Sequence, residues 1–267
     1  MRNLILILLL IVVETSNSYG RLNSICISRI DEKENNLYKY AEKLTIEGRN
    51  EEALTVFKNL LKTDSNNVNY LWHTSILYSQ LGISQPDEKS RMSWYKTAES
   101  LATKAVSVDS STAKAHLAYA IAIGRLSEHA NPKIQIKYAK LVKTEAETVI
   151  RQDPKLGTAY HVLGKWHYIV AGFNYLELSM IKLLFGGIPG GTYTDAIHNF
   201  EMAVKLEPNR CLHYLELAKS YVARDKKGDK ELAISYLNKG IKIAPRNHEE
   251  TVTHDNAVAY LKKITKK

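Results

Sequence analysis

Five segments of this chain share one spacing of small and apolar residues, and each segment ends at a residue that can stop a helix. In the clearest of them, Ala196, Phe200 and Ala203 fall on one helical face, and Pro208 follows five residues later. Proline lacks an amide hydrogen and disfavours helix at the preceding residue, so this helix must end there. The same spacing precedes four other stops, which are Ser65, Ser110, Pro154 and Pro245. The recurrence predicts five helical hairpins in succession.

The hairpin pattern resembles the tetratricopeptide repeat, in which small and apolar residues line two antiparallel helices. Gly164, on the first helix of the fourth hairpin, and Ala203, on its second helix, are small where the two helices must approach closely. The standard repeat has 34 residues, whereas the stops in this chain lie 45, 44, 54 and 37 residues apart. The extra residues are therefore expected between the two helices of a hairpin.

The longest insertion, Ala171 to Gly191, lies inside the fourth hairpin. Its apolar residues favour an additional helix before the sequence GGIPGG, and its charged residues Glu177 and Lys182 argue against a membrane-spanning segment. Two interpretations remain open for this helix: an extension that packs on the array, or a surface that contacts a membrane or a partner. Thr192 stands three residues before Asp195, which is typical of a capped helix start.

The sequence around this insertion resembles, more specifically, the regulator of microtubule dynamics family. The match covers roughly residues 98–245 and is carried by Gly164, Trp166, His167, Tyr168, Val170, Ala171, Gly172, Leu184, Phe185, Gly186, Gly187, Pro189, Thr192, Tyr193 and Ala196. The resemblance implies a tetratricopeptide-like helical domain. It also implies an intracellular protein that associates with microtubules, as family members in animal cells do.

We therefore predict an all-α, right-handed superhelix of about five helical hairpins, with a C-terminal capping helix. The repeat domain is expected over residues 35–267, after an N-terminal linker over 21–34. In the last helix, Val252, Val258, Leu261 and Ile264 have the spacing to cover the open end of the core.

The N-terminus has the composition of a secretory signal peptide over residues 1–20. Arg2 precedes an unbroken apolar run from Leu4 to Val13, which is too short to span a bilayer, and Ser18 and Gly20 are small enough for a cleavage site. This pattern predicts an exported protein, either periplasmic, secreted or in the secretory pathway. An uncleaved N-terminal membrane anchor is the alternative. Export would separate the protein from microtubules.

The charge balance of the chain is basic. The formal net charge is +9, and residues 220–267 contain eleven Lys and Arg against six acidic residues. A basic surface favours an acidic partner, but no nucleic-acid-binding module is present in the sequence, so we expect no nucleic acid. The two cysteines, Cys26 and Cys211, are too few for a disulfide framework and are interpreted as buried thiols or, less simply, as one bridge.

No motif in the sequence indicates catalysis, a cofactor or a metal. The glycine-rich run Gly186 to Gly191 lacks the Lys-Ser/Thr pair that holds phosphates. His161 and His167 are six residues apart, which does not place two ligands on one helical face. We therefore expect a protein that is not an enzyme and has no cofactor.

The candidate site is the inner, concave face of the array, which first helices line in this repeat class. By register, this face contains Trp72, Ile76, Leu117, Ile121, His161, Lys165, Tyr168, Leu215, Lys219 and Val222. The mixture of aromatic, aliphatic and basic groups suits an acidic peptide, although the apolar members could equally be core. Reversing the charges of Lys165 and Lys219 is expected to leave the fold intact, because exposed charges add little stability.

The function predicted from these features is a non-enzymatic scaffold or adaptor that binds a protein or peptide. Two alternatives remain open. One is a microtubule-associated regulator, as in the resembled family, and the other is an accessory subunit of an envelope or secretory-pathway enzyme complex. The insertion over 171–191 adds a possible peripheral membrane contact.

Overall fold

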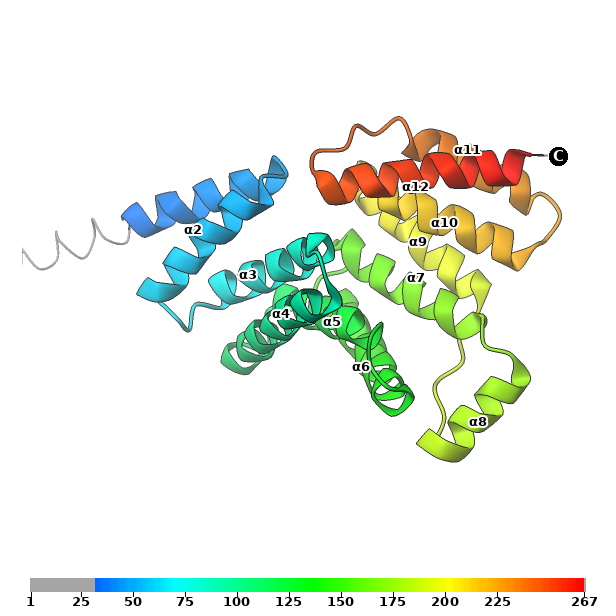
Figure 1. Cartoon of the computed structure of the whole chain (residues 1–267), viewed down its shortest axis with the longest axis horizontal. Helices are drawn as coiled ribbons and strands as arrows, with labels where there is room; N and C mark the ends of the chain where they lie inside the picture. The colour runs from blue at the N-terminus through cyan, green and yellow to red at the C-terminus, as the bar shows by residue number, and fades with distance from the viewer. Residues whose placement is uncertain (1–31, 267) are drawn as a thin grey trace, which may run out of the picture.

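The computed structural model describes residues 32–266, and in this range the chain is helical without any strand (Figure 1). Five helical hairpins follow one another and stack into a right-handed superhelix. They pair 32–46 with α2 (Asn50–Thr63), α3 (Val68–Leu81) with α4 (Glu88–Val108), α5 (Ala113–Ser127) with α6 (Pro132–Gln152), α7 (Gly157–Ala171) with α9 (Tyr193–Leu206), and α10 (Cys211–Arg224) with α11 (Asp229–Gly240). A short 3-10 turn, η1 (Gly82–Ser84), follows α3. The inserted helix is α8 (Tyr175–Phe185), and the terminal helix is α12 (His248–Thr265).

The predicted register is confirmed in every hairpin. Helices α2, α4, α6 and α9 each end two residues before the predicted stop, and α11 ends five residues before Pro245. The residues of the repeated spacing are buried in the helix-helix contacts, with Val142 as the partly exposed exception. The stops act locally, through proline or through turn residues, which is why the sequence alone locates the ends of these helices.

Side chains at the helix starts fix several boundaries. Thr192 accepts a hydrogen bond from the Asp195 amide at 3.0 Å, as the spacing of these residues predicts. Asn174 accepts from the Glu177 amide, and the Glu177 side chain in turn accepts from the Asn174 amide, which completes a capping box for α8. The insertion thus contains its own start signal, independent of the array around it.

Close packing between α7 and α9 depends on one glycine. Phe200 is fully buried, and a Cβ atom placed on Gly164 would lie 3.1 Å from the Phe200 ring. A larger residue at position 164 would therefore require the Phe200 ring to move by a few tenths of an ångström. The core continues from hairpin to hairpin as contiguous clusters of alanine, leucine and aromatic side chains rather than as one central mass.

The two ends of the described array touch each other. Arg246, in the loop before α12, donates a hydrogen bond to the Ile46 carbonyl at 3.0 Å and is itself held by Glu250. Across the interior, Arg125 on α5 lies 3.6 Å from Glu249 on α12. A polar cavity of about 170 Å³ lies between the ends, beside Asn50, Gln80 and Arg210. In Figure 1 the start of α12 accordingly lies next to the first hairpin.

The terminal helix caps the array, but not with all of the predicted residues. Ala257 is buried, and Leu261 and Ile264 pack against the core of the fifth hairpin. Val252, which was expected to contribute, is instead 43% exposed because it lies in the first turns of α12, away from that core.

The predicted signal peptide over 1–20, the first part of the predicted linker and Cys26 lie outside the described residues. The last three linker positions, 32–34, already belong to the first helix. Cys211 is buried at the start of α10, and burial raises the pKa of its thiol.

Candidate functional site

The apolar half of the predicted inner stripe belongs to the core. Trp72, Leu117 and Leu215 are each at most 6% exposed, and each lies in a core cluster between neighbouring hairpins. Ile76 and Ile121 pack against these clusters from the edge. Their side chains stabilise the stacking of the hairpins and leave little apolar surface for a partner in this part of the face.

The polar half of the stripe lies around Glu216, a residue that the sequence alone does not single out. Glu216 on α10 is 3% exposed, and its two carboxylate oxygens accept from Lys165 Nζ at 2.6 Å and Lys219 Nζ at 2.7 Å. Lys165 Nζ also lies 5.5 Å from the centre of the Tyr168 ring. Lys165 comes from α7 and Lys219 from α10, so successive first helices do bring these two cations to one place, as predicted.

This cluster is electrostatically balanced to within one charge. Burial raises the pKa of Glu216, but Lys165 and Lys219 together lower it below its usual value, so the carboxylate is ionised at neutral pH. Two ammonium groups around one carboxylate leave one net positive charge beside the Tyr168 ring. No local pattern in the sequence points to Glu216, because its partner Lys165 lies 51 residues away.

A second polar network lies deeper, between α7 and α10. The Nδ1 atoms of His161 and His213 are 3.0 Å apart, so one ring donates to the other. His213 Nε2 is 3.2 Å from Glu207, which also accepts from the Thr158 amide and hydroxyl. Burial lowers the pKa of both histidines, and the pKa of His161 lies well below its usual value. His161 therefore acts as part of a buried hydrogen-bond network and not as an exposed contact residue.

His73 on α3 provides a measurable pH dependence. Burial, with a smaller contribution from Lys114, lowers the pKa of His73 to about 3. A histidine whose pKa is lowered in the folded state contributes stability at neutral pH. This stability is lost as the pH falls below about 6.5, the pKa of histidine in the unfolded chain. We expect His73→Gln to remove about 2 kcal/mol of the stability difference between about pH 7 and pH 5.

Urea denaturation at these two pH values measures the effect. His198→Gln, at an exposed position of α9, is the matched control and should leave the pH dependence of the wild type unchanged. Glu207 does not add to the pH dependence between pH 7 and pH 5. Burial raises its pKa, but His213 and Arg210 bring the pKa down to about 2, so the contribution of Glu207 to stability falls only below about pH 4.5. Equal pH dependence in the wild type and His73→Gln would contradict a neutral buried His73.

The C-terminal end of the array presents exposed lysines that have no carboxylate partner among the described residues. The loop between α10 and α11 and the last turn of α12 lie at the same end of the molecule, because α10 and α12 run in the same direction (Figure 1). Six exposed lysines lie in or directly beside these segments, at positions 226, 227, 230, 262, 263 and 266. None of their ammonium groups lies within 4.0 Å of a carboxylate in the described part of the chain. By contrast, Arg224 at the end of α10 is paired with Asp229.

The inserted helix α8 is the other unusual surface. It is bent by 105° from α7, projects from the array and contacts it through α6, so it packs on the array over only part of its length (Figure 1). Only Ile181 of this helix is buried. No single described helix is long and apolar enough to cross a membrane, whereas the bent pair α7 and α8 reaches the required length and composition together.

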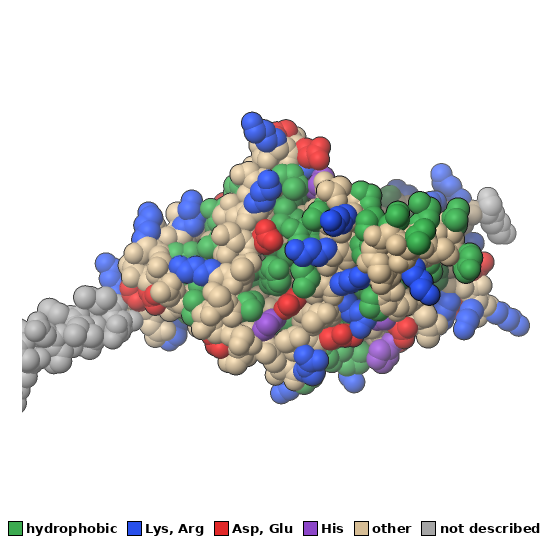
Figure 2. All heavy atoms as spheres, turned by 90° about the horizontal axis from the view of Figure 1, so that it is seen from below, with side chains coloured by type: hydrophobic (Ala, Val, Ile, Leu, Met, Phe, Trp, Pro, Cys, Tyr) green, Lys and Arg blue, Asp and Glu red, His purple; other side chains and the backbone are tan. Residues whose placement is uncertain are grey.

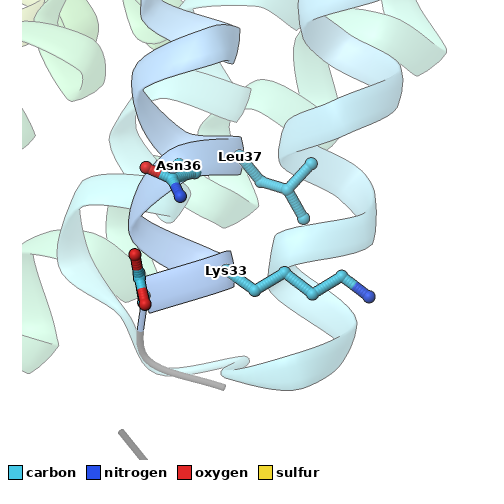
Figure 3. A pocket seen from close by; sticks show the side chains of 4 residues that line it. Lys33, Asn36 and Leu37 are labelled. Atoms are coloured by element: carbon cyan, nitrogen blue, oxygen red, sulfur yellow. The ribbon is translucent and has the colours of Figure 1, made fainter. Parts of the chain in front are cut away.

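Two other features of the described residues do not indicate a functional site. A shallow hollow on the first helix, lined by Glu32, Lys33, Asn36 and Leu37, borders the part of the chain that is not described, and we assign it no role (Figure 3). No group of three His, Cys, Asp or Glu side chains within residues 32–266 is arranged to hold a metal ion.

Comparison with known proteins identifies the relatives of this chain. The family described as "Regulator of microtubule dynamics protein 1-3" matches residues 37–265. Regulator of microtubule dynamics protein 1 of Bos taurus is 33% identical over 61% of this chain and 50% of its own length. Protein 2 of Mus musculus is 25% identical over 71% of this chain and 46% of its own length. The chain thus spans about half the length of these relatives.

A solved structure supports the fold independently. The tetratricopeptide-repeat protein TTC0263 of Thermus thermophilus superposes with a TM-score of 0.61 at 16% identity, over 85% of this chain and 99% of its own. At this level of identity, the likeness concerns the fold alone.

The relatives also correct the predicted location. The matched proteins are named for the regulation of microtubules, which are filaments inside the cell, so the prediction of an exported protein is wrong. The apolar run over 4–13 is common to several kinds of N-terminal segment, so composition alone does not establish export.

Proposed function

Because the chain belongs to the regulator of microtubule dynamics family, we propose that it is a non-enzymatic, microtubule-associated adaptor that binds an acidic protein surface. Its tetratricopeptide-like fold is of a class that binds proteins or peptides. The microtubule interpretation replaces the accessory subunit of an envelope complex, since that alternative required export.

The observation that carries this proposal is the basic end of the array, defined as lysines 226, 227, 230, 262, 263 and 266. These six side chains are exposed and have no carboxylate partner within the described residues, so their charge is available to another molecule. Tubulin is an acidic protein, and a basic patch attracts such a surface over about one Debye length. The proposed contact is therefore electrostatic and dependent on salt.

The inner face offers a second, smaller contact. Lys165, Lys219 and Tyr168 remain partly exposed, and Glu216 behind them accepts hydrogen bonds from both lysines. One net positive charge beside an aromatic ring suits a single acidic side chain of a bound segment. We propose that the basic end provides most of the attraction and that the inner face selects the bound segment.

Sedimentation with polymerised tubulin tests the basic end. The variant Lys226→Glu/Lys227→Glu/Lys230→Glu should bind at least about tenfold more weakly than the wild type, and raised salt should weaken the wild type similarly. The matched control is Lys39→Glu/Lys58→Glu/Lys96→Glu, which makes the same change of net charge at exposed positions of the first two hairpins. An equal loss in both variants, or in neither, would show that the basic end is not the contact.

A further inference from the structure

Helix α8 is attached to the array at few points. Its buried residue Ile181 faces the array, and Lys140 on α6 donates to the Phe185 carbonyl at the end of α8 at 3.1 Å. After α8, Gly186 and Gly187 both have positive φ and turn the chain back toward α9. The helix therefore has a defined orientation, while most of its surface stays uncovered by the described residues.

The uncovered surface of α8 is strongly apolar. Leu176, Met180, Leu183 and Leu184 are spaced by four, three and one residues, so they form one stripe along the helix, hereafter the α8 stripe. Their exposed fractions range from 51% for Met180 to 83% for Leu183. Tyr175, at the first turn of the same helix, is 87% exposed. Figure 2 shows hydrophobic side chains gathered at this end of the molecule, with Lys and Arg side chains around them.

The surroundings of the α8 stripe are basic. The first twelve residues of α6, 132–143, contain four lysines and no acidic residue, and the segment 174–191 adds Lys182 and the single acid Glu177. Glu177 already accepts from the Asn174 amide in the capping box. Lys143 is paired with Glu147, whereas Lys133, Lys137 and Lys182 are exposed. An apolar stripe with a cationic border is typical of a helix that lies in a membrane interface.

We propose that α8 binds the surface of a membrane that contains anionic lipids. The α8 stripe enters the boundary of the acyl chains, and Lys133, Lys137 and Lys182 contact the headgroups. With 11 residues, α8 is about 16 Å long and cannot cross the hydrocarbon core of about 30 Å, so it lies at the surface. An apolar protein groove would cover the stripe equally well but would leave the cationic border without a partner.

This proposal goes beyond microtubule binding, because it involves a different surface. In this proposal, one array binds two anionic partners: a microtubule at the basic end and a membrane at α8. The two contacts are separable by mutation, since the basic end contains none of the α8 or α6 residues.

Vesicle flotation with the full chain tests the proposal. The protein should float with vesicles of phosphatidylcholine mixed with phosphatidylserine at least about tenfold better than with phosphatidylcholine alone. The variant Leu176→Ser/Met180→Ser/Leu183→Ser should lose this binding. The matched control, Ile46→Ser/Val108→Ser/Leu232→Ser, removes exposed apolar side chains elsewhere on the array and should retain it. Circular dichroism of each variant checks folding, and all six positions are exposed.

A second measurement does not depend on loss of function. Leu183→Trp places a fluorophore on the α8 stripe, whereas the native Trp72 and Trp166 are buried and Trp94 is partly buried on α4 of the second hairpin. Its emission should shift to the blue with mixed vesicles, and Ile46→Trp should show no such shift. Equal binding to neutral vesicles, binding that survives loss of the stripe, or a stripe-dependent dimer in the absence of vesicles would each overturn the proposal.

Discussion

Replacement of Phe200 by alanine is expected to lower the free energy of unfolding by roughly 3–5 kcal/mol. The Phe200 side chain is fully buried between α7 and α9, against Gly164 and 5.2 Å from the His161 ring, measured between ring centres. Alanine would leave a cavity that the neighbouring helices cannot fill, because their close approach is already fixed by the small residues Gly164 and Ala203.

Urea denaturation followed by circular dichroism measures this loss. Leu232→Ala on α11 is the control, because its side chain is 43% exposed and should cost less than about 1 kcal/mol. Gly164→Ala tests the same contact from the other side, since the added methyl group would crowd the Phe200 ring at 3.1 Å. A loss below about 1 kcal/mol for Phe200→Ala would contradict the packing described here.

The sequence was sufficient for the hairpins because their signals are local. The spacing of Ala196, Phe200 and Ala203 and the stop at Pro208 act within one helix, and Thr192 caps the same helix. The existence of α8 was predictable for the same reason. The direction of α8 was not, because the 105° bend depends on how the short link after α7 meets the rest of the array.

The candidate site was predictable only in part. The register correctly placed Lys165 and Lys219 near each other, since both lie on first helices of neighbouring hairpins. It could not identify Glu216, whose charge looks like any other on an amphipathic helix until the partner 51 residues away is known. The contact of Arg246 with Ile46 joins residues 200 apart, and only the superhelical curvature brings them together.

Removal of both lysines around Glu216 is expected to destabilise the fold by about 3 kcal/mol. The Lys165→Met/Lys219→Met variant leaves a carboxylate that is 3% exposed without either cation. An unpaired buried charge is costly, although part of the cost is relieved because the side chain of Lys165 is 42% exposed and water can reach the site. The sequence-based expectation that charge reversal at these lysines leaves the fold intact is therefore not supported by this geometry.

Neutralising the carboxylate distinguishes this mechanism from a simple loss of packing. Adding Glu216→Gln to the double variant should restore most of the lost stability, because the amide needs no cation. Glu216→Gln alone should cost less than the double variant, since both lysines can turn toward solvent. Urea denaturation of the four proteins completes a thermodynamic cycle. If the triple variant is no more stable than the double variant, the lysines act through packing and not through their charge.

The triple variant is also the appropriate protein for testing the inner face. It lacks both cations of the proposed contact, but Glu216→Gln also removes the buried charge that those cations neutralised. Its binding is therefore not confounded by partial unfolding. We expect it to sediment with polymerised tubulin about two- to tenfold more weakly than the wild type, because a partly exposed ion contact contributes on the order of 1 kcal/mol. Loss of the basic end should have a larger effect than this. Unchanged binding by a fully folded triple variant would restrict the contact to the basic end and leave Lys165, Lys219 and Glu216 with a structural role.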